Sequence, residues 1–149
     1  MMQHKPVIGA RSNSKQLGQW AEQQATLLLQ QAGYTIVKQN YHSRYGEIDV
    51  IAKKQDEWVF VEVKARQPTQ YGYAVEMITA SKQLKMFKTA LKFIQEQAED
   101  QVLYYRFDVI CFDFCQAIAK NLQHDFSQLA YDQHWIENAF TIDADLINL

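Results

Sequence analysis

Apolar residues recur along this chain with two periods, one typical of helices and one typical of strands. Over residues 14–32 they return every three or four positions, at Leu17, Trp20 or Ala21, Ala25, Leu28 and Ala32. Ser12 and Ser14 can cap the start of this helix, and Gly33 stands where a left-handed C-terminal cap belongs. We therefore expect a first helix over residues 14–32.

A second helix is predicted over residues 79–98, after a loop that contains the turn-forming residues Pro68 and Gly72. Its two faces differ in character. One face is apolar, with Leu84, Phe87, Leu91, Ile94 and Ala98, and the other is basic, with Lys82, Lys85, Lys88 and Lys92. The basic stripe is either a solvated face or a surface for a polyanion, and the spacing leaves both readings open.

Four segments have the composition of strands. YTIVKQNY is a short strand that ends at the loop HSRYG, and two further strands are predicted over residues 47–53 and 57–64. VLYYRFDVICFDF is one long strand or two short ones, and the chain after it is too weakly patterned for a prediction. Strands interleaved with two helices predict an α/β protein with a central mixed sheet flanked by helices.

The two middle strands carry ionisable residues inside apolar runs. If residues 54–57 form a hairpin loop, residue 53 pairs with 58, 51 with 60 and 49 with 62. One face of the hairpin is then wholly apolar, with Ile48, Val50, Ala52, Val59, Val61 and Val63. The other face collects Glu47, Asp49, Ile51, Phe60, Glu62 and Lys64. In this register Asp49 faces Glu62 directly.

Two carboxylates about 5 Å apart repel each other by about 3 kcal/mol at an effective dielectric constant of about 20. Protonation of one carboxyl, neutralisation by Lys64, or a divalent cation between the two would relieve this repulsion. Mg²⁺ commonly takes one or two carboxylates and completes its shell with water and phosphate oxygens. Asp49, Glu62 and Lys64 therefore suit metal-assisted hydrolysis of a phosphodiester, although a solvent-facing hairpin edge with a Glu–Lys pair has the same spacing.

Composition and charge narrow the class of protein. The 149 residues are 48% hydrophobic with only two prolines and five glycines, which is typical of a folded globular chain. The apolar runs are too short to span a membrane, and the first residues lack the apolar core of a signal peptide, so we expect a cytoplasmic protein without membrane contact. Residues 1–95 contain 13 Lys and Arg against 7 Asp and Glu, whereas residues 96–149 contain 2 against 10. The acidic pair therefore lies in a basic region, which suits an anionic partner, but a solvated basic face beside an acidic C-terminal region would give the same counts.

Other candidate residues are ambiguous. Arg44 and Arg66 flank the two acidic strands and could clamp phosphates, but acidic partners in the C-terminal region would suit them equally. Asp108 is expected to be structural, pairing with Arg106 or a backbone donor. Cys111 and Cys115 are expected to be reduced, and a zinc site with His124 and His134 does not match the usual spacings.

The motifs GEIDVIA and VFVEVKAR, followed by Lys82 and RFDVI, resemble those of the YraN-like family of small uncharacterised bacterial proteins. That family is similar to the PD-(D/E)XK superfamily, which includes restriction endonucleases and Holliday-junction resolvases. The resemblance runs from about Leu17 to Phe112. It implies a restriction-endonuclease-like fold. From the chain length we expect one domain over residues 14–149 behind a flexible arm at residues 1–13, with an acidic C-terminal region at residues 113–149.

The resemblance also implies roles for individual residues. Asp49 and Glu62 correspond to metal ligands and catalytic residues, Lys64 to the lysine of the E-x-K pair, and Glu22 to an additional acidic residue near the metal. Ala21 departs from the glycine that the family usually has before this glutamate. Lys82 corresponds to a lysine that contacts phosphate, and Arg44, Arg66 and Lys85 are further candidates for nucleic-acid binding.

We therefore expect an endonuclease that uses Mg²⁺ or Mn²⁺ and acts on nucleic acid, DNA rather than RNA, with structured or branched DNA as one class of substrate. A homodimer would be compatible with cutting two strands. The alternative is a nucleic-acid-binding module that keeps the fold without catalysis, and an adaptor that uses the acidic C-terminal region is a third reading.

Overall fold

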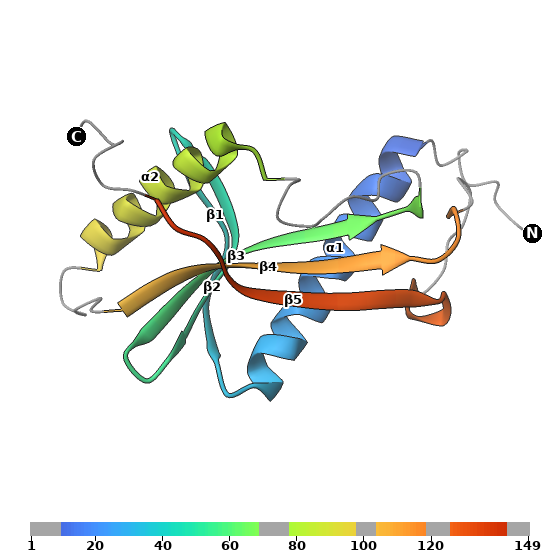
Figure 1. Cartoon of the computed structure of the whole chain (residues 1–149), viewed down its shortest axis with the longest axis horizontal. Helices are drawn as coiled ribbons and strands as arrows, with labels where there is room; N and C mark the ends of the chain where they lie inside the picture. The colour runs from blue at the N-terminus through green and yellow to red at the C-terminus, as the bar shows by residue number, and fades with distance from the viewer. Residues whose placement is uncertain (1–9, 69–77, 98–103, 119–125, 143–149) are drawn as a thin grey trace, which may run out of the picture.

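A five-stranded mixed sheet with one helix on each face forms the core of the computed structural model (Figure 1). The structure describes residues 10–68, 78–97, 104–118 and 126–142. The sheet order follows the chain: β1 (Thr35–Ser43), β2 (Gly46–Lys54), β3 (Glu57–Arg66), β4 (Tyr104–Phe114) and β5 (Tyr131–Phe140). The α/β class and the mixed sheet are confirmed, and the arrangement is consistent with a restriction-endonuclease-like fold.

The two helices pack on opposite faces of the sheet. Helix α1 (Ala10–Gln31) buries Leu17, Trp20, Ala21, Ala25 and Leu29 against Val50, Ala52, Val59 and Val61. Helix α2 (Ala80–Glu96) buries Met86, Phe87, Ala90 and Phe93 against Ile51, Trp58, Phe60 and Phe107. Since β3 and β4 are parallel, α2 lies in the crossover connection that joins them. Strands β2 and β3 are thus covered on both sides.

The predicted N-cap of the first helix is wrong, and its predicted C-cap is right. Helix α1 begins at Ala10, so Ser12 and Ser14 lie inside it and cannot be its N-cap, and residues expected in a flexible arm belong to the helix. The C-terminal prediction is confirmed: Gly33 has φ +93°, and the amides of Gly33 and Tyr34 donate to the carbonyls of Gln30 and Leu29. In α2 the Thr79 side chain caps the helix by accepting from the Lys82 amide. Residues 1–9, Gly72 and Ala98 lie outside the described residues.

The hairpin register is confirmed where β2 and β3 pair. Lys53 pairs with Trp58 and Ile51 with Phe60, although Lys54 also pairs with Glu57, so the loop is shorter than expected. Ile48 does not share a face with Val50. It packs with Ile51 and Tyr41 on the α2 side, because the strand alternation is interrupted at Asp49.

Two other strand predictions were incomplete. Strand β1 extends to Ser43 and leaves only a tight turn before β2, and VLYYRFDVICFDF contains one long strand, β4. Strand β5 was missed. It lies at the edge of the sheet and most of its side chains are exposed or half-buried, so its apolar alternation is weak, and its pairing with β4 defines it.

Candidate active site

The candidate site lies where the ladder between β1 and β2 skips one residue on each strand. Gln39 pairs with Val50 and Tyr41 with Ile48, which leaves Asn40 opposite Asp49 without a ladder pair between them. Asn40 has φ +51°, a left-handed conformation that is uncommon for residues other than glycine but that asparagine tolerates. Because of this irregularity in both strands, Ile48 lies on the α2 side of the sheet and not on the α1 side with Val50. The Asp49 side chain likewise does not follow the regular alternation of the strand.

The Asp49 side chain connects β2 to β3 by a hydrogen bond. Its Oδ2 accepts the backbone N–H of Val63 at 2.8 Å, beyond the point where the pairing of β2 with β3 ends at Val50 and Val61. Asp49 is 8% exposed and Glu62 is 4% exposed. Burial, and then the charge of Glu62, raise the pKa of Asp49 to about 7, against the lowering effect of the Val63 amide. The charge of Glu62 thus acts on Asp49, although the expected pairing of residue 49 with residue 62 is not part of the β2–β3 ladder, which ends at Val50 and Val61.

Two lysines converge on one oxygen of Glu62. Lys64 Nζ lies 3.2 Å and Lys82 Nζ 3.4 Å from Glu62 Oε1. The other oxygen, Glu62 Oε2, is buried and has no hydrogen-bond partner among the described residues. A buried carboxylate oxygen without a partner is costly, so this atom is suited to a ligand that would supply one.

Two further carboxylates border the pair, and we call the four, Glu22, Glu47, Asp49 and Glu62, the acidic pocket. Glu22 on α1 accepts from Asn40 Nδ2 at 3.3 Å. Burial raises the pKa of Glu22, and the charges of Glu47 and Glu62 add to that rise. Glu47 Oε2 lies 3.4 Å from His42 Nδ1. The structure thus brings Glu22, predicted on a helix, to the two strand carboxylates.

The donor set of the acidic pocket fits a hard divalent cation in part. Across the described residues, no three His, Cys, Asp or Glu side chains are close enough to form a complete metal site by themselves. Asp49 and Glu62 do provide two carboxylates, one with an unsatisfied oxygen, and Mg²⁺ often takes only one or two carboxylates from a protein. Their mutual repulsion would fall when a cation binds between them.

The cysteine predictions are also answered here. Cys111 is buried, Cys115 is exposed, and neither is in a disulfide. His134 pairs with Asp113 at 3.4 Å, and His124 lies outside the described residues.

The basic residues that we expected to bind nucleic acid differ in exposure and in their partners. Arg44 and Lys85 are exposed, and Lys82 reaches Glu62 in the acidic pocket. Arg66 is buried and forms a bidentate ion pair with Asp113, at 2.6 and 2.7 Å, so its guanidinium does not face solvent. The binding prediction for Arg66 is therefore corrected in favour of the acidic partner that we considered beside it.

Asp108 has the structural role that we predicted. It accepts from Arg106 Nε, from Trp135 Nε1 and from the Asn138 amide, each at 2.9 Å, and it is fully buried. The bonds from Trp135 and Asn138 join β4 to the edge strand β5. Asp108 therefore stabilises the sheet and is not a member of the acidic pocket.

Sequence reasoning missed Asn40. Its signal was an asparagine inside an otherwise strand-like segment, since asparagine is depleted in strands and enriched at left-handed positions. The segment alone could not show that this residue stands opposite Asp49 and contacts Glu22.

Among the described helices, none is long and apolar enough to cross a membrane.

Comparison with known proteins finds bacterial relatives of this chain. The sequence profile of the uncharacterised protein family UPF0102 matches residues 21–112, which include every member of the acidic pocket. A UPF0102 protein of Acinetobacter baumannii (strain AYE) is 58% identical over 130 residues, which cover 87% of this chain and 98% of that protein. One from Acinetobacter baylyi is 52% identical over 93% of this chain and 97% of that protein. A more distant one, from Clostridium acetobutylicum, is 38% identical over 87% of this chain and 97% of that protein. The chain belongs to the UPF0102 family.

Proposed function

We propose that this protein is a divalent-metal-dependent nuclease of the PD-(D/E)XK type that hydrolyses phosphodiester bonds, in DNA rather than RNA. One observation carries the proposal. Asp49 and Glu62 form a buried carboxylate pair in which one oxygen has no partner among the described residues, and two lysines lie beside it. A pair of carboxylates next to ammonium groups can hold a cation and a phosphate at the same time.

Each residue has a role that follows from its position. Asp49 and Glu62 would hold Mg²⁺ or Mn²⁺, which supplies a Lewis acid that polarises the phosphate and lowers the pKa of a water molecule. Lys64, 29% exposed in its side chain, would orient the attacking water or donate to a phosphate oxygen. Lys82 would donate to a second phosphate oxygen. Glu22, with its raised pKa, would accept a hydrogen bond from water at the edge of the pocket.

The two lysines also explain how the pair persists without a cation. Both ammonium groups lie near Glu62 Oε1 and offset its charge, while a proton on Asp49 offsets the rest. When a phosphate enters, the lysines can turn from Glu62 to the phosphate oxygens. Substrate and metal would then bind cooperatively, because the phosphate supplies oxygen ligands that the protein does not.

The test is a calorimetric titration of Mn²⁺ into the wild type and into Asp49→Asn. Asn keeps an acceptor for the Val63 amide but removes the charge, so binding should disappear while folding is retained. Asp56→Asn is the matched control, since Asp56 is exposed in the β2–β3 turn. The titration is repeated with a short DNA duplex present, so that a phosphate can supply missing ligands.

Cleavage of linear, flapped and branched DNA is then measured with the same three proteins. The proposal predicts Mn²⁺-dependent cleavage by the wild type and by Asp56→Asn, and none by Asp49→Asn. Unaltered cleavage by Asp49→Asn would exclude this site. DNA binding that survives Asp49→Asn, with no cleavage under any metal, would favour a non-catalytic nucleic-acid-binding module.

A further inference from the structure

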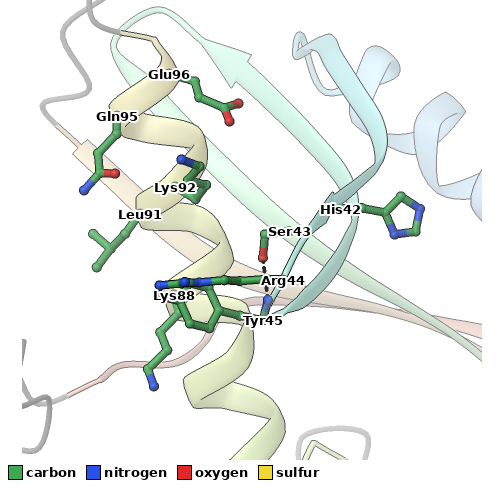
Figure 2. A pocket seen from close by; sticks show the side chains of 9 residues that line it. All are labelled: His42, Ser43, Arg44, Tyr45, Lys88, Leu91, Lys92, Gln95 and Glu96. Atoms are coloured by element: carbon green, nitrogen blue, oxygen red, sulfur yellow. Dashed lines mark hydrogen bonds between the residues drawn. The ribbon is translucent and has the colours of Figure 1, made fainter.

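A second feature, a basic groove, lies beside the acidic pocket between the β1–β2 turn and helix α2. It encloses about 610 Å³, within the usual range of ligand pockets, which is about 300–1,000 Å³. It is lined by His42 and Ser43 at the end of β1, by Arg44 and Tyr45 of the turn, and by Lys88, Leu91, Lys92, Gln95 and Glu96 from α2 (Figure 2).

Positive charge dominates this groove. Arg44, Lys88 and Lys92 line it, and Glu96 is the one carboxylate among the described lining residues. Glu96 already accepts from Tyr41 at 2.8 Å. Arg44 and Lys88 gather around the Tyr45 ring, at 4.8 and 5.4 Å from its centroid (Figure 2). A hydrogen bond from Arg44, with the charges of Arg44, Lys88 and Lys92, lowers the pKa of Tyr45, so an added anion would be favoured there.

A hydrogen bond connects the two walls of the groove. The Ser43 hydroxyl is 2.8 Å from that of Thr89, a fully buried residue of α2, and it also accepts the Tyr45 amide at 3.1 Å. This bridge fixes the turn against the helix. The cations therefore stand on a preorganised frame, which lowers the cost of binding a ligand.

A row of lysines on α2 connects the basic groove with the acidic pocket. Four lysines follow one side of α2: Lys82 at Glu62, Lys85 beside Gly46, then Lys88 and Lys92 in the groove. His42 forms part of the wall, but its ring points away from α2 and reaches Glu47 of the acidic pocket (Figure 2). From residue 82 to residue 92 a helix rises about 15 Å. A nucleic-acid strand has about one phosphate per 3.4 Å of its axis, so this path spans about four phosphates.

We propose that the basic groove binds the phosphodiester backbone of the nucleic-acid strand whose next phosphates enter the acidic pocket. The proposal rests on the proposed function, and it adds Lys88, Lys92 and Tyr45 as binding residues. A strand is favoured over a single phosphate ion because the cations extend along the helix as far as the acidic pocket. The contacts are to the backbone, so binding carries no sequence preference.

The experiment is fluorescence anisotropy with labelled single-stranded DNA over a range of salt concentrations, in EDTA so that no cleavage occurs. Lys88→Ala/Lys92→Ala is compared with Lys15→Ala/Lys38→Ala, which removes the same charge from two exposed lysines outside the groove. Each phosphate contact contributes about 0.7 to the slope of log affinity against log salt for single strands. Compared with the wild type, the groove variant should have a slope smaller in magnitude by about 1.4, and the control should have the wild-type slope. Equal slopes for the two variants would overturn the proposal.

Two additions make the result decisive. Lys88→Arg/Lys92→Arg keeps the charges and should restore the slope, and a thermal melt of each variant confirms that it is folded. Deoxyadenosine monophosphate and inorganic phosphate are tested as competitors. Displacement of the strand by either at micromolar concentration would overturn the assignment to a strand in favour of a small phosphate ligand.

The experiments distinguish a failure of the groove proposal from a failure of the nuclease proposal. If the groove variant loses affinity in EDTA but the wild type cleaves nothing with any metal, the groove assignment stands and the nuclease proposal fails. If the wild type cleaves DNA in an Asp49-dependent manner and the groove variant binds and cleaves like the Lys15/Lys38 control, the groove assignment fails and the nuclease proposal stands.

Discussion

Asp49 shows at the scale of one residue that the acidic pocket is not built for stability. A carboxylate 8% exposed, with a second carboxylate nearby, is strained by burial and repulsion, and the Val63 amide relieves only part of this. Apolar residues of similar volume would pack here at lower cost. Two carboxyl groups with raised pKa values, Asp49 and Glu22, in one cluster are typical of a functional site.

The raised pKa of Asp49 predicts a pH-dependent stability. In the folded protein this pKa is about 7 and its ordinary value is 3.8, so the folded state binds the proton more tightly. The contribution is fully present below the unfolded pKa and is lost as pH rises through about 7. Asp49→Asn should therefore raise the melting temperature more at pH 8 than at pH 5. Each kcal/mol relieved corresponds to roughly 2–4 °C in a chain of this size.

Thermal melts in EDTA at the two pH values check this, with Asp56→Asn as the control because that side chain is exposed. The control should shift the melting temperature little, and equally at both pH values. An Asp49→Asn shift that is the same at pH 5 and pH 8 would contradict the raised pKa.

At the scale of one element, strands β1 and β2 carry a matched irregularity. Asn40 and Asp49 face each other outside the regular ladder, and the change of face carries Ile48 to the α2 side together with Tyr41. Strained backbone at such a point persists only when its surroundings hold it. Here the Asn40 amide contacts Glu22 on α1, so the same irregularity that frees Asp49 also ties the helix carboxylate to the strand.

Substitutions at Asn40 separate the backbone effect from the side-chain effect. Asn40→Ala places an ordinary residue at φ +51° and should cost about 1–2 kcal/mol in the free energy of unfolding. Asn40→Gly accommodates this φ and should stay closer to the wild type, although both variants lose the contact with Glu22. Urea unfolding measures the difference. Equal destabilisation by Ala and Gly would mean that the left-handed backbone contributes nothing.

At the scale of the whole molecule, the sheet separates two cores, and residues from both helices reach its acidic pocket. Of the acidic pocket, Glu22 comes from α1 and the other three members come from β2 and β3, while Lys82, which pairs with Glu62, comes from α2. Phe93 is central to the α2 core. Its ring lies 5.3 Å from that of Tyr41, 5.5 Å from that of Trp58 and 6.1 Å from that of Phe60.

Phe93→Ala should therefore loosen α2 from the sheet. We expect a loss of about 3–5 kcal/mol in the free energy of unfolding, because a large buried ring leaves a cavity that the neighbours fill only in part. Leu27→Ala, at a side chain 49% exposed on α1, is the control and should change stability little. Urea unfolding followed by tryptophan fluorescence checks both. A loss below about 1 kcal/mol for Phe93→Ala would show that α2 is not held by this ring cluster.

Local patterns predicted much of the fold. The helices over residues 14–32 and 79–98, the strands around the hairpin and the register of Ile51 with Phe60 follow from spacings within a few residues. The places where prediction failed depend on distant partners. Strand β5 is defined by its pairing with β4, and Arg66 is paired with Asp113, 47 residues away, so nothing near Arg66 revealed its burial.

The sequence by itself determined the α/β class, the hairpin and the candidate residues Asp49, Glu62 and Lys64, because periodicity and register operate over short separations. Only the tertiary structure decided that Asn40 leaves the ladder opposite Asp49, that Lys82 and Lys64 meet at one oxygen of Glu62, and that a basic groove adjoins the pocket. These arrangements join segments far apart in the chain. They arise from the packing of two helices on one sheet, which no local pattern contains.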